Sequence, residues 1–139
     1  MKVLFICRAN VGRSQMAEAL FNKYSKNHKA KSAGTHVEEK EGHTIGEKET
    51  ANFVCEVMNE EGIDVRKNKR KQLTPKMVEE ANKVVIITDK KDWPDYLKKS
   101  DKVIYWNLQD AKDTDYDFHI KTRDWIKKRV RKLLKEIEQ

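Results

Sequence analysis

The chain has 139 residues, enough for one compact domain with one hydrophobic core, so we expect residues 1–139 to form a single domain. Lys and Arg outnumber Asp and Glu by 30 to 23, which gives a net charge of +7. No apolar run approaches the roughly 18 residues of a membrane span. Arg8 also interrupts the N-terminal apolar run that a signal peptide would need. We therefore expect a cytoplasmic protein, without a membrane partner, whose two cysteines are free thiols.

The first part of the chain predicts two strands and two helices. Residues 2–7 are almost all apolar, which is typical of a strand buried on both faces. Residues 14–28 predict a helix, since apolar side chains recur every four positions. A second strand ends at residues 31–34, and the polar stretch 35–45 predicts a loop. An apolar stripe over residues 51–58 then predicts the second helix.

The second part of the chain continues the alternation. Thr74 and Pro75 predict the start of a helix that runs to about Ala81, and the apolar runs 84–87 and 103–106 predict strands. A last helix carries apolar side chains on one face as far as Ile137. Strands that alternate with helices favour a parallel sheet. We expect an α/β fold, a single-domain three-layer sandwich whose four-stranded parallel sheet has the order 2-1-3-4, with helices on both faces.

The segment that joins the first strand to the first helix contains the candidate catalytic and phosphate-binding residues. In a sheet of this order it lies at the topological switch point, where ligands bind. The backbone N–H groups of a tight loop and a helix N-terminus can surround a phosphate. Arg13 adds a planar fork for two oxygens, and Cys7 at the base supplies a nucleophilic thiolate that the same positive field stabilises. The predicted phosphate-binding loop consists of Cys7, Arg8, Ala9, Asn10, Val11, Gly12, Arg13 and Ser14.

Two simpler interpretations of this loop are open at the level of the residues alone. In the first, Cys7 ends a strand as an ordinary core residue, and Arg13 and Ser14 merely start a helix. Gly12-Arg13-Ser14 also has some likeness to the Gly-Lys-Ser of nucleotide-binding loops. Such loops need an earlier glycine where Cys7 stands and a lysine where Arg13 stands, which disfavours a nucleoside triphosphate.

The chain resembles the low molecular weight protein tyrosine phosphatase superfamily, which includes thiol-dependent arsenate reductases. The resemblance rests on VLFICRANVGRSQMAEAL, SAGT at 32–35, EGIDV at 61–65, VVIITD at 84–89 and the closing segment 106–134. It implies that Cys7 is the nucleophile and that Arg13 binds the oxyanion. By the same resemblance, Asn10 orders the loop, Ser14 activates the thiol, and Asp110 is the general acid.

Some positions depart from the family pattern. Asp110 is followed by Ala111 and Lys112, where the typical phosphatase has a proline and the aromatic residues that flank phosphotyrosine. A neighbouring carboxylate, from Asp113, Asp115 or Asp117, is the alternative to Asp110 as the acid.

Other departures concern the loop itself and the thiols. Ala9 replaces a frequent glycine, and Gly12 stands where many members have a second loop cysteine. Thr88 matches the position at which an internal cysteine cascade would need a thiol. We expect Cys55 to be a buried core residue, which disfavours a cascade within one chain.

The remaining polar clusters predict no cofactor. The histidines have no metal-ligand spacing, so we expect no metal site and an exposed position for each of them. The basic segment 66–71 predicts a solvated face that attracts anionic substrates, without a specific nucleic-acid partner. The four histidines are His28, His36, His43 and His119.

Three functional hypotheses follow. The first is a phosphomonoester hydrolase of the protein tyrosine phosphate type, a monomer, that acts on a phosphorylated protein or small phosphomonoester through a phosphocysteine on Cys7, with Asp110 as acid. The second is an arsenate reductase that uses an external thiol or a thioredoxin-type partner as reductant. The third is a non-catalytic module that binds phosphoproteins or other oxyanions.

Overall fold

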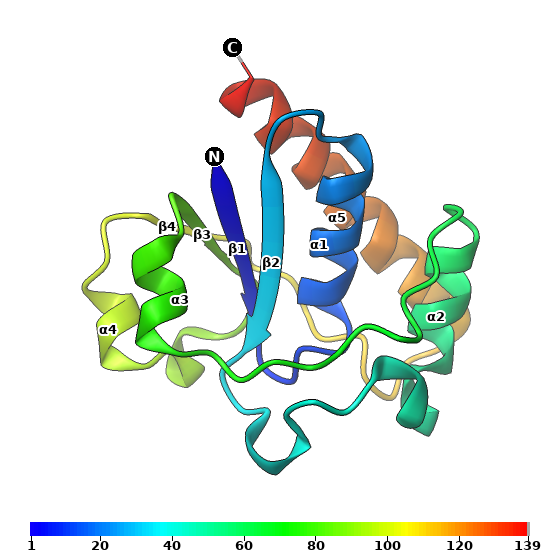
Figure 1. Ribbon diagram of the computed structural model, residues 1–139. Helices are drawn as coiled ribbons and strands as arrows, with labels where there is room; N and C mark the ends of the chain where they lie inside the picture. Colours follow the sequence, from blue (N-terminus) through cyan, green and yellow to red (C-terminus); the bar gives the residue numbers. More distant parts are fainter. Residues whose placement is uncertain (139) are drawn as a thin grey trace.

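The computed structural model, which describes residues 1–138, has a sheet of four parallel strands (Figure 1). The strands are β1 (Lys2–Cys7), β2 (Lys29–Gly34), β3 (Lys83–Ile86) and β4 (Val103–Tyr105), in the spatial order β2-β1-β3-β4. The predicted α/β fold and strand order are confirmed. β1 is central and pairs with β2 on one side and β3 on the other, which puts the residues that follow Cys7 at the switch point.

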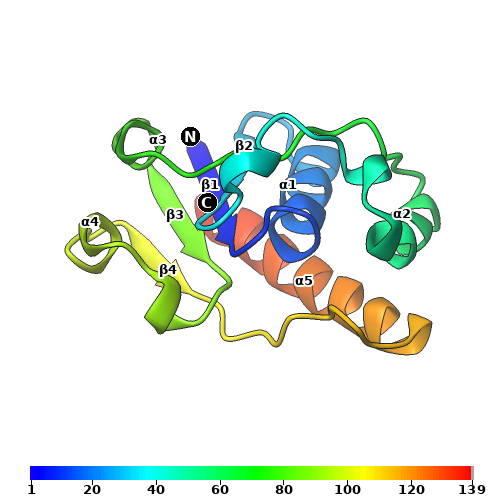
Figure 2. The same cartoon turned by 90° about the horizontal axis from the view of Figure 1, so that it is seen from below.

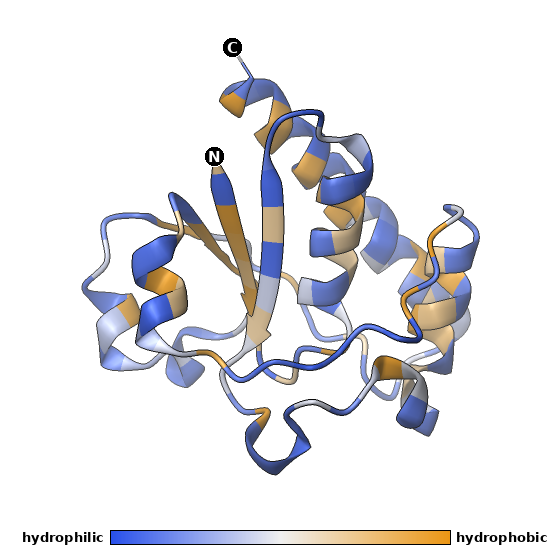
Figure 3. Cartoon of the chain, in the orientation of Figure 1, coloured by the Kyte–Doolittle hydropathy of each residue, from blue (hydrophilic) through white to orange (hydrophobic). Residues whose placement is uncertain are grey.

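Helices cover both faces of the sheet (Figures 1 and 2). The α-helices are α1 (Arg13–Tyr24), α2 (Asn52–Asn59), α3 (Pro75–Glu80), α4 (Asp95–Lys98) and α5 (Tyr116–Ile137). Val3 and Phe5 of β1 pack in the core with α1, α2 and α5, whereas Leu4 and Ile6 pack against α3 and α4. This alternation explains why β1 is hydrophobic almost throughout, while β2 at the edge of the sheet carries lysines (Figure 3).

Element boundaries differ from the prediction at some points. α1 ends at Tyr24 and not at His28, because the Ser25 hydroxyl accepts from the His28 backbone N–H and donates to the His28 carbonyl oxygen, each at 2.9 Å. These two bonds close a turn that leads into β2. The segment predicted as a loop contains a short 3-10 turn at Glu38–Lys40, and α4 was not predicted. None of the helices formed by residues 1–138 is both long and apolar enough to cross a membrane.

Candidate active site

The segment 7–14 forms a tight loop between the end of β1 and the first turn of α1. Gly34, at the end of the neighbouring strand β2, lies directly against it. A Cβ atom at Gly34 would be 2.7 Å from the Arg8 carbonyl oxygen and 2.9 Å from the Asn10 backbone nitrogen. Backbone atoms cannot retreat from such contacts without moving the loop, so a residue without a side chain is required here.

Asn10 holds the loop in shape from the inside. It is fully buried and adopts the left-handed backbone conformation, with φ of 55°. Its Oδ1 atom accepts a hydrogen bond from the Lys71 backbone N–H at 2.8 Å, which fixes the orientation of the amide. The amide nitrogen then donates to the hydroxyl oxygens of Ser14, at 2.8 Å, and Ser32, at 3.0 Å.

Ser14 connects Asn10 to the sulfur atom of Cys7 through hydrogen bonds. The two side chains are buried, and Ser14 Oγ lies 2.9 Å from Cys7 Sγ. Since Ser14 Oγ already accepts from Asn10, its own hydrogen is available for the sulfur. A hydroxyl that donates to sulfur favours the thiolate, the form in which a cysteine is nucleophilic.

Arg13 is held in place by hydrogen bonds to the segments that follow β3 and β4. Its guanidinium donates to the Ile87 carbonyl oxygen at 2.5 Å and to the Leu108 carbonyl oxygen at 3.1 Å. The side chain is buried, and the positive charge is therefore held in a fixed place beside Cys7, in the wall of the same pocket. These contacts leave part of the guanidinium fork for an oxyanion.

The loop backbone supplies further donors. Within residues 1–138, the backbone N–H groups of residues 9–12 have no hydrogen-bond partner. Gly12, the N-cap of α1, likewise provides no side-chain cap for the first turn of the helix. Free N–H groups next to a helix N-terminus are suited to bind a phosphate or a similar oxyanion.

Arg8 does not line the pocket, although it belongs to the predicted loop. Its guanidinium forms an ion pair with Asp92 at 2.6 Å, and half of the side chain is exposed. Asp92 is itself held by the Thr88 hydroxyl at 3.1 Å. Arg8 thus ties the loop to the turn that follows β3, and the side chain of Thr88 is part of this structural support.

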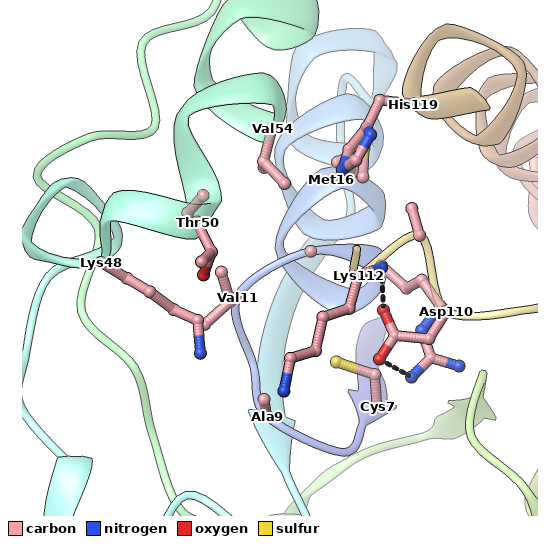
Figure 4. Close-up of a pocket in the computed structure, with 14 residues that line it drawn as sticks. Cys7, Ala9, Val11, Met16, Lys48, Thr50, Val54, Asp110, Lys112 and His119 are labelled. Atoms are coloured by element: carbon pink, nitrogen blue, oxygen red, sulfur yellow. Dashed lines mark hydrogen bonds and ion pairs between the residues drawn. The ribbon is translucent and has the colours of Figure 1, made fainter. Parts of the chain in front are cut away.

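Asp110, from the loop before α5, lines the pocket beside Cys7 (Figure 4). One carboxylate oxygen is 3.5 Å from an Arg13 nitrogen, and the other accepts from the Lys112 backbone N–H at 3.0 Å. Its side chain is 52% exposed, so it can exchange protons with water. Asp115 instead caps α5 by accepting from the Phe118 N–H at 2.8 Å. Within residues 1–138, Asp110 is the one carboxylate that lines this pocket.

The pocket around Cys7 has an apolar side and a basic side (Figure 4). Val11, Met16 and Val54 provide apolar surface, whereas Lys48 and Lys112 provide positive charge. The remaining lining residues are Cys7, Ala9, Gly12, Arg13, Thr50, Ala51, Asp110, Ala111 and His119.

The basic segment 66–71 is not simply a solvated face, as had been predicted. Arg70 is buried, and its Nε atom donates to the Ala9 carbonyl oxygen at 3.2 Å. Burial lowers the pKa of the Arg70 guanidinium, and the Cys7 thiolate acts in the opposite direction. The backbone of Lys69 accepts from the Gln15 amide at 3.1 Å. No local pattern in the sequence distinguishes Arg70 from the exposed cations that precede it.

His119 also corrects the prediction that every histidine is exposed. It is buried, lines the pocket and donates from Nδ1 to the Asp115 carbonyl oxygen at 2.8 Å. Its ring packs edge-on against Phe53, with centroids 5.3 Å apart. The histidine lies one turn into α5, on the same face as buried Thr122 and Arg123, and that position accounts for its burial.

The second thiol is remote from this chemistry. Cys55 is a buried residue of α2 and does not line the pocket of Cys7. Burial raises the pKa of the Cys55 thiol, which disfavours its reactive thiolate form. Among residues 1–138 no group of three or more His, Cys, Asp and Glu side chains is arranged to hold a metal ion.

Comparisons with known proteins agree with this geometry. The model of the family "low molecular weight phosphotyrosine protein phosphatase" matches residues 2–139. A low molecular weight protein tyrosine phosphatase from T. tengcongensis is 28% identical, with a TM-score of 0.83, over 98% of this chain and 99% of that one. No curated protein sequence matches the chain.

Other similar structures have different activities. An arsenate reductase from Archaeoglobus fulgidus is 26% identical, with a TM-score of 0.69, over 95% of this chain and 98% of that one. The YwlE arginine phosphatase from Geobacillus stearothermophilus is 23% identical, with a TM-score of 0.81, over 99% of this chain and 92% of that one. At this last level of identity the likeness concerns the fold alone.

Proposed function

We propose that this chain, which belongs to the low molecular weight phosphotyrosine protein phosphatase family, hydrolyses phosphate monoesters through a covalent phosphate on Cys7. The observation that carries the proposal is the chain of hydrogen bonds from Asn10 through Ser14 to the sulfur of Cys7. Such a chain prepares a thiolate at the base of an anion-binding loop, a feature that a purely structural cysteine does not need.

In the first step, the Cys7 thiolate attacks the phosphorus atom of the bound ester. The sulfur–phosphorus bond forms while the bond from phosphorus to the ester oxygen breaks. The loop N–H groups and Arg13 stabilise the charge on the equatorial oxygens. Asp110, in its protonated form, gives its proton to the departing oxygen, so that the alcohol or phenol leaves neutral.

In the second step, water attacks the phosphorus atom of the phosphocysteine. Asp110, now a carboxylate, accepts a proton from this water, and the sulfur–phosphorus bond breaks. Inorganic phosphate leaves, and the Cys7 thiolate is restored with the help of the Ser14 hydroxyl. Asp110 and Cys7 line the same pocket, which gives the carboxyl group access first to the leaving oxygen and then to water.

A phosphotyrosine-type ester is the substrate that we propose first. Val11, Met16 and Val54 offer an apolar wall against which an aromatic ring can pack. The aromatic pair that flanks phosphotyrosine in the typical family member is replaced by Ala111 and Lys112. We therefore expect a phenyl phosphate to be turned over with a higher KM than in enzymes that have those aromatic residues. A phosphoarginine side chain fits less well, because its cationic guanidinium would face Lys48 and Lys112.

Arsenate reduction is the second candidate, since arsenate has the shape and charge of phosphate and one relative is an arsenate reductase. Cys7 would form an arseno-cysteine adduct, whose reduction to arsenite needs two electrons from thiols. Cys55 is buried and unsuited to the task, and the described pocket contains no other thiol besides Cys7. An external thiol or a thioredoxin-type protein would therefore have to supply the electrons. A non-catalytic oxyanion-binding module is the third candidate.

One side-by-side assay separates these functions. The protein is incubated with p-nitrophenyl phosphate and a chelator, and in parallel with arsenate and a small dithiol, and the release of phosphate and arsenite is measured. We expect phosphate release that Cys7→Ser abolishes, whereas Cys55→Ser leaves it intact. Arsenite formation without phosphate release would identify the reductase, and binding of phosphate without either product would identify the binding module. A cytoplasmic location, a monomeric state and a phosphoprotein substrate are proposed on the grounds given by the sequence.

A further inference from the structure

We propose that Lys48 and Lys112 form a second anion-binding subsite at the mouth of the pocket, which selects phosphorylated residues flanked by carboxylates. The inference rests on the proposed phosphatase function and adds the substrate class, an acidic phosphopeptide. Both lysines line the same pocket as Cys7. They come from two separate segments, Lys48 from the turns before α2 and Lys112 from the loop before α5.

The two side chains approach the pocket from different walls. Figure 4 shows both of them extended toward the part of the loop that carries Ala9, with the ammonium groups at their tips. Lys48 is partly buried, whereas Lys112 is exposed. The aliphatic stems contribute to the pocket wall, and the charged ends are available to a ligand that projects out of the pocket.

The charge at this mouth is not balanced by the protein. Neither lysine lies within ion-pair distance of a carboxylate in the described part of the chain. Burial, followed by the positive charges of Arg70 and Lys112, lowers the pKa of Lys48. The carboxylate of Asp110 opposes this shift, but it is already paired with Arg13 at 3.5 Å. Cations that repel one another in this way gain free energy when an anion binds between them.

The scissile phosphate does not account for these lysines. It is surrounded by the free N–H groups of residues 9–12 and by Arg13, which lie at the base of the pocket. Lys48 and Lys112 belong to neither the loop nor the first turn of α1, so they are available to the part of a substrate that extends beyond the phosphate. A carboxylate on a residue next to the phosphorylated one has the charge and reach to contact them.

The test compares two phosphotyrosine peptides that differ only in their flanking residues, Asp and Glu in one and Asn and Gln in the other. We expect kcat/KM to be about tenfold higher for the acidic peptide at low salt, and the ratio to decline as salt is added. Lys48→Gln and Lys112→Gln should each lower the ratio, and the double variant should bring it close to one. Lys128→Gln, which removes an exposed lysine on α5, serves as the matched control and should leave the ratio unchanged.

The outcomes that overturn the inference are distinct from those that overturn the phosphatase function. A wild-type ratio of one, or a ratio that survives in the double variant, would remove the subsite. An equal loss for both peptides would show that the lysines bind only the scissile phosphate. If neither peptide is hydrolysed, the phosphatase function fails. The affinities of the Cys7→Ser protein for the two peptides, measured by calorimetry, then still decide whether the acidic one is preferred.

Discussion

The two walls of the pocket are built in different ways. The phosphate-binding loop is buried and held at several points, since Asn10 alone makes hydrogen bonds to Ser14, Ser32 and Lys71. The loop that carries Asp110 is exposed, and the described contacts of this carboxylate are the Lys112 N–H and the Arg13 ion pair. One wall is thus pre-organised to bind an anion, and the other is able to exchange protons with solvent. Changes in the two walls should therefore have separable effects on binding, turnover and stability.

The largest of these effects is expected in the exposed wall. Asp110→Asn should lower kcat for phosphate release by ~10²–10⁴-fold, because the acid that protonates the leaving oxygen is lost. The free energy of unfolding should stay within about 0.5 kcal/mol of the wild type, as is usual for an exposed site. Steady-state kinetics and urea unfolding measure the two quantities.

Its matched control is Asp113→Asn, an exposed neighbour that does not line the pocket. If Asp113→Asn lowers kcat and Asp110→Asn does not, the general acid has been assigned to the wrong residue. The affinity for inorganic phosphate, measured as competitive inhibition, should be retained in both variants.

A change in the buried wall should reduce binding and turnover together. Arg13→Lys keeps the positive charge but loses the planar fork and at least one of the carbonyl contacts to Ile87 and Leu108. We expect kcat/KM to fall by ~10²–10³-fold, the range seen when a donor to a developing oxyanion is removed. The inhibition constant of phosphate should rise at the same time. Unaltered inhibition by phosphate would show that Arg13 is structural only.

Asn10 stabilises the loop in two ways, through its side-chain hydrogen bonds and through its tolerance of the left-handed backbone conformation. Asn10→Ala loses the side-chain hydrogen bonds and also places in the left-handed conformation, at φ of 55°, a residue that tolerates it less well than asparagine. We expect the free energy of unfolding to fall by ~1–3 kcal/mol, the range for a buried polar network that loses a member. Asn10→Gly loses the same hydrogen bonds but tolerates this φ, and should recover about 0.5–1 kcal/mol of the loss. Equal stabilities would mean that the backbone conformation contributes nothing.

The smallest effect is expected far from both walls, at Glu61. Its carboxylate is 2.7 Å from the Lys127 ammonium group, and the hydrogen bond from Lys127 lowers the pKa of Glu61 below its ordinary value of 4.5. A lowered pKa in the folded state adds stability above pH 4.5, which is lost as pH falls through the lowered value. Glu61→Gln should thus cost about 0.5–1 kcal/mol at pH 7 and nothing measurable near pH 2. A pH-independent difference would contradict this assignment, and the phosphatase activity should be unchanged.

The sequence was sufficient for the strands and the loop, because these depend on local patterns, and for the parallel sheet, because strands alternate with helices along the chain. An unbroken apolar run followed by Cys7, Gly12 and Arg13 defines a buried strand, a tight loop and a helix start in a single stretch. Asp110, which the resemblance to the family indicates as the acid, also lines the pocket.

What the sequence could not indicate depends on contacts between distant segments. Arg70 is one of five cations in the segment 66–71, and it is buried where its Nε atom donates to the carbonyl oxygen of Ala9, on a loop far away in the chain. His119 is buried because α5 crosses α2, where Phe53 covers the ring. The subsite of Lys48 and Lys112 likewise forms when two loops meet over the pocket. None of these relations has a signature in the spacing of neighbouring residues.

The proposed covalent mechanism is tested most directly by detecting phosphate bound to Cys7 during turnover. The protein is mixed with an aryl phosphate, quenched within milliseconds to seconds and analysed by mass spectrometry of its peptides. We expect phosphate on the peptide that contains Cys7, in a larger amount in Asp110→Asn than in the wild type, because the loss of the base slows attack by water. Phosphate release at the wild-type rate without a modified Cys7, or with Cys7→Ser in place, would contradict the central claim.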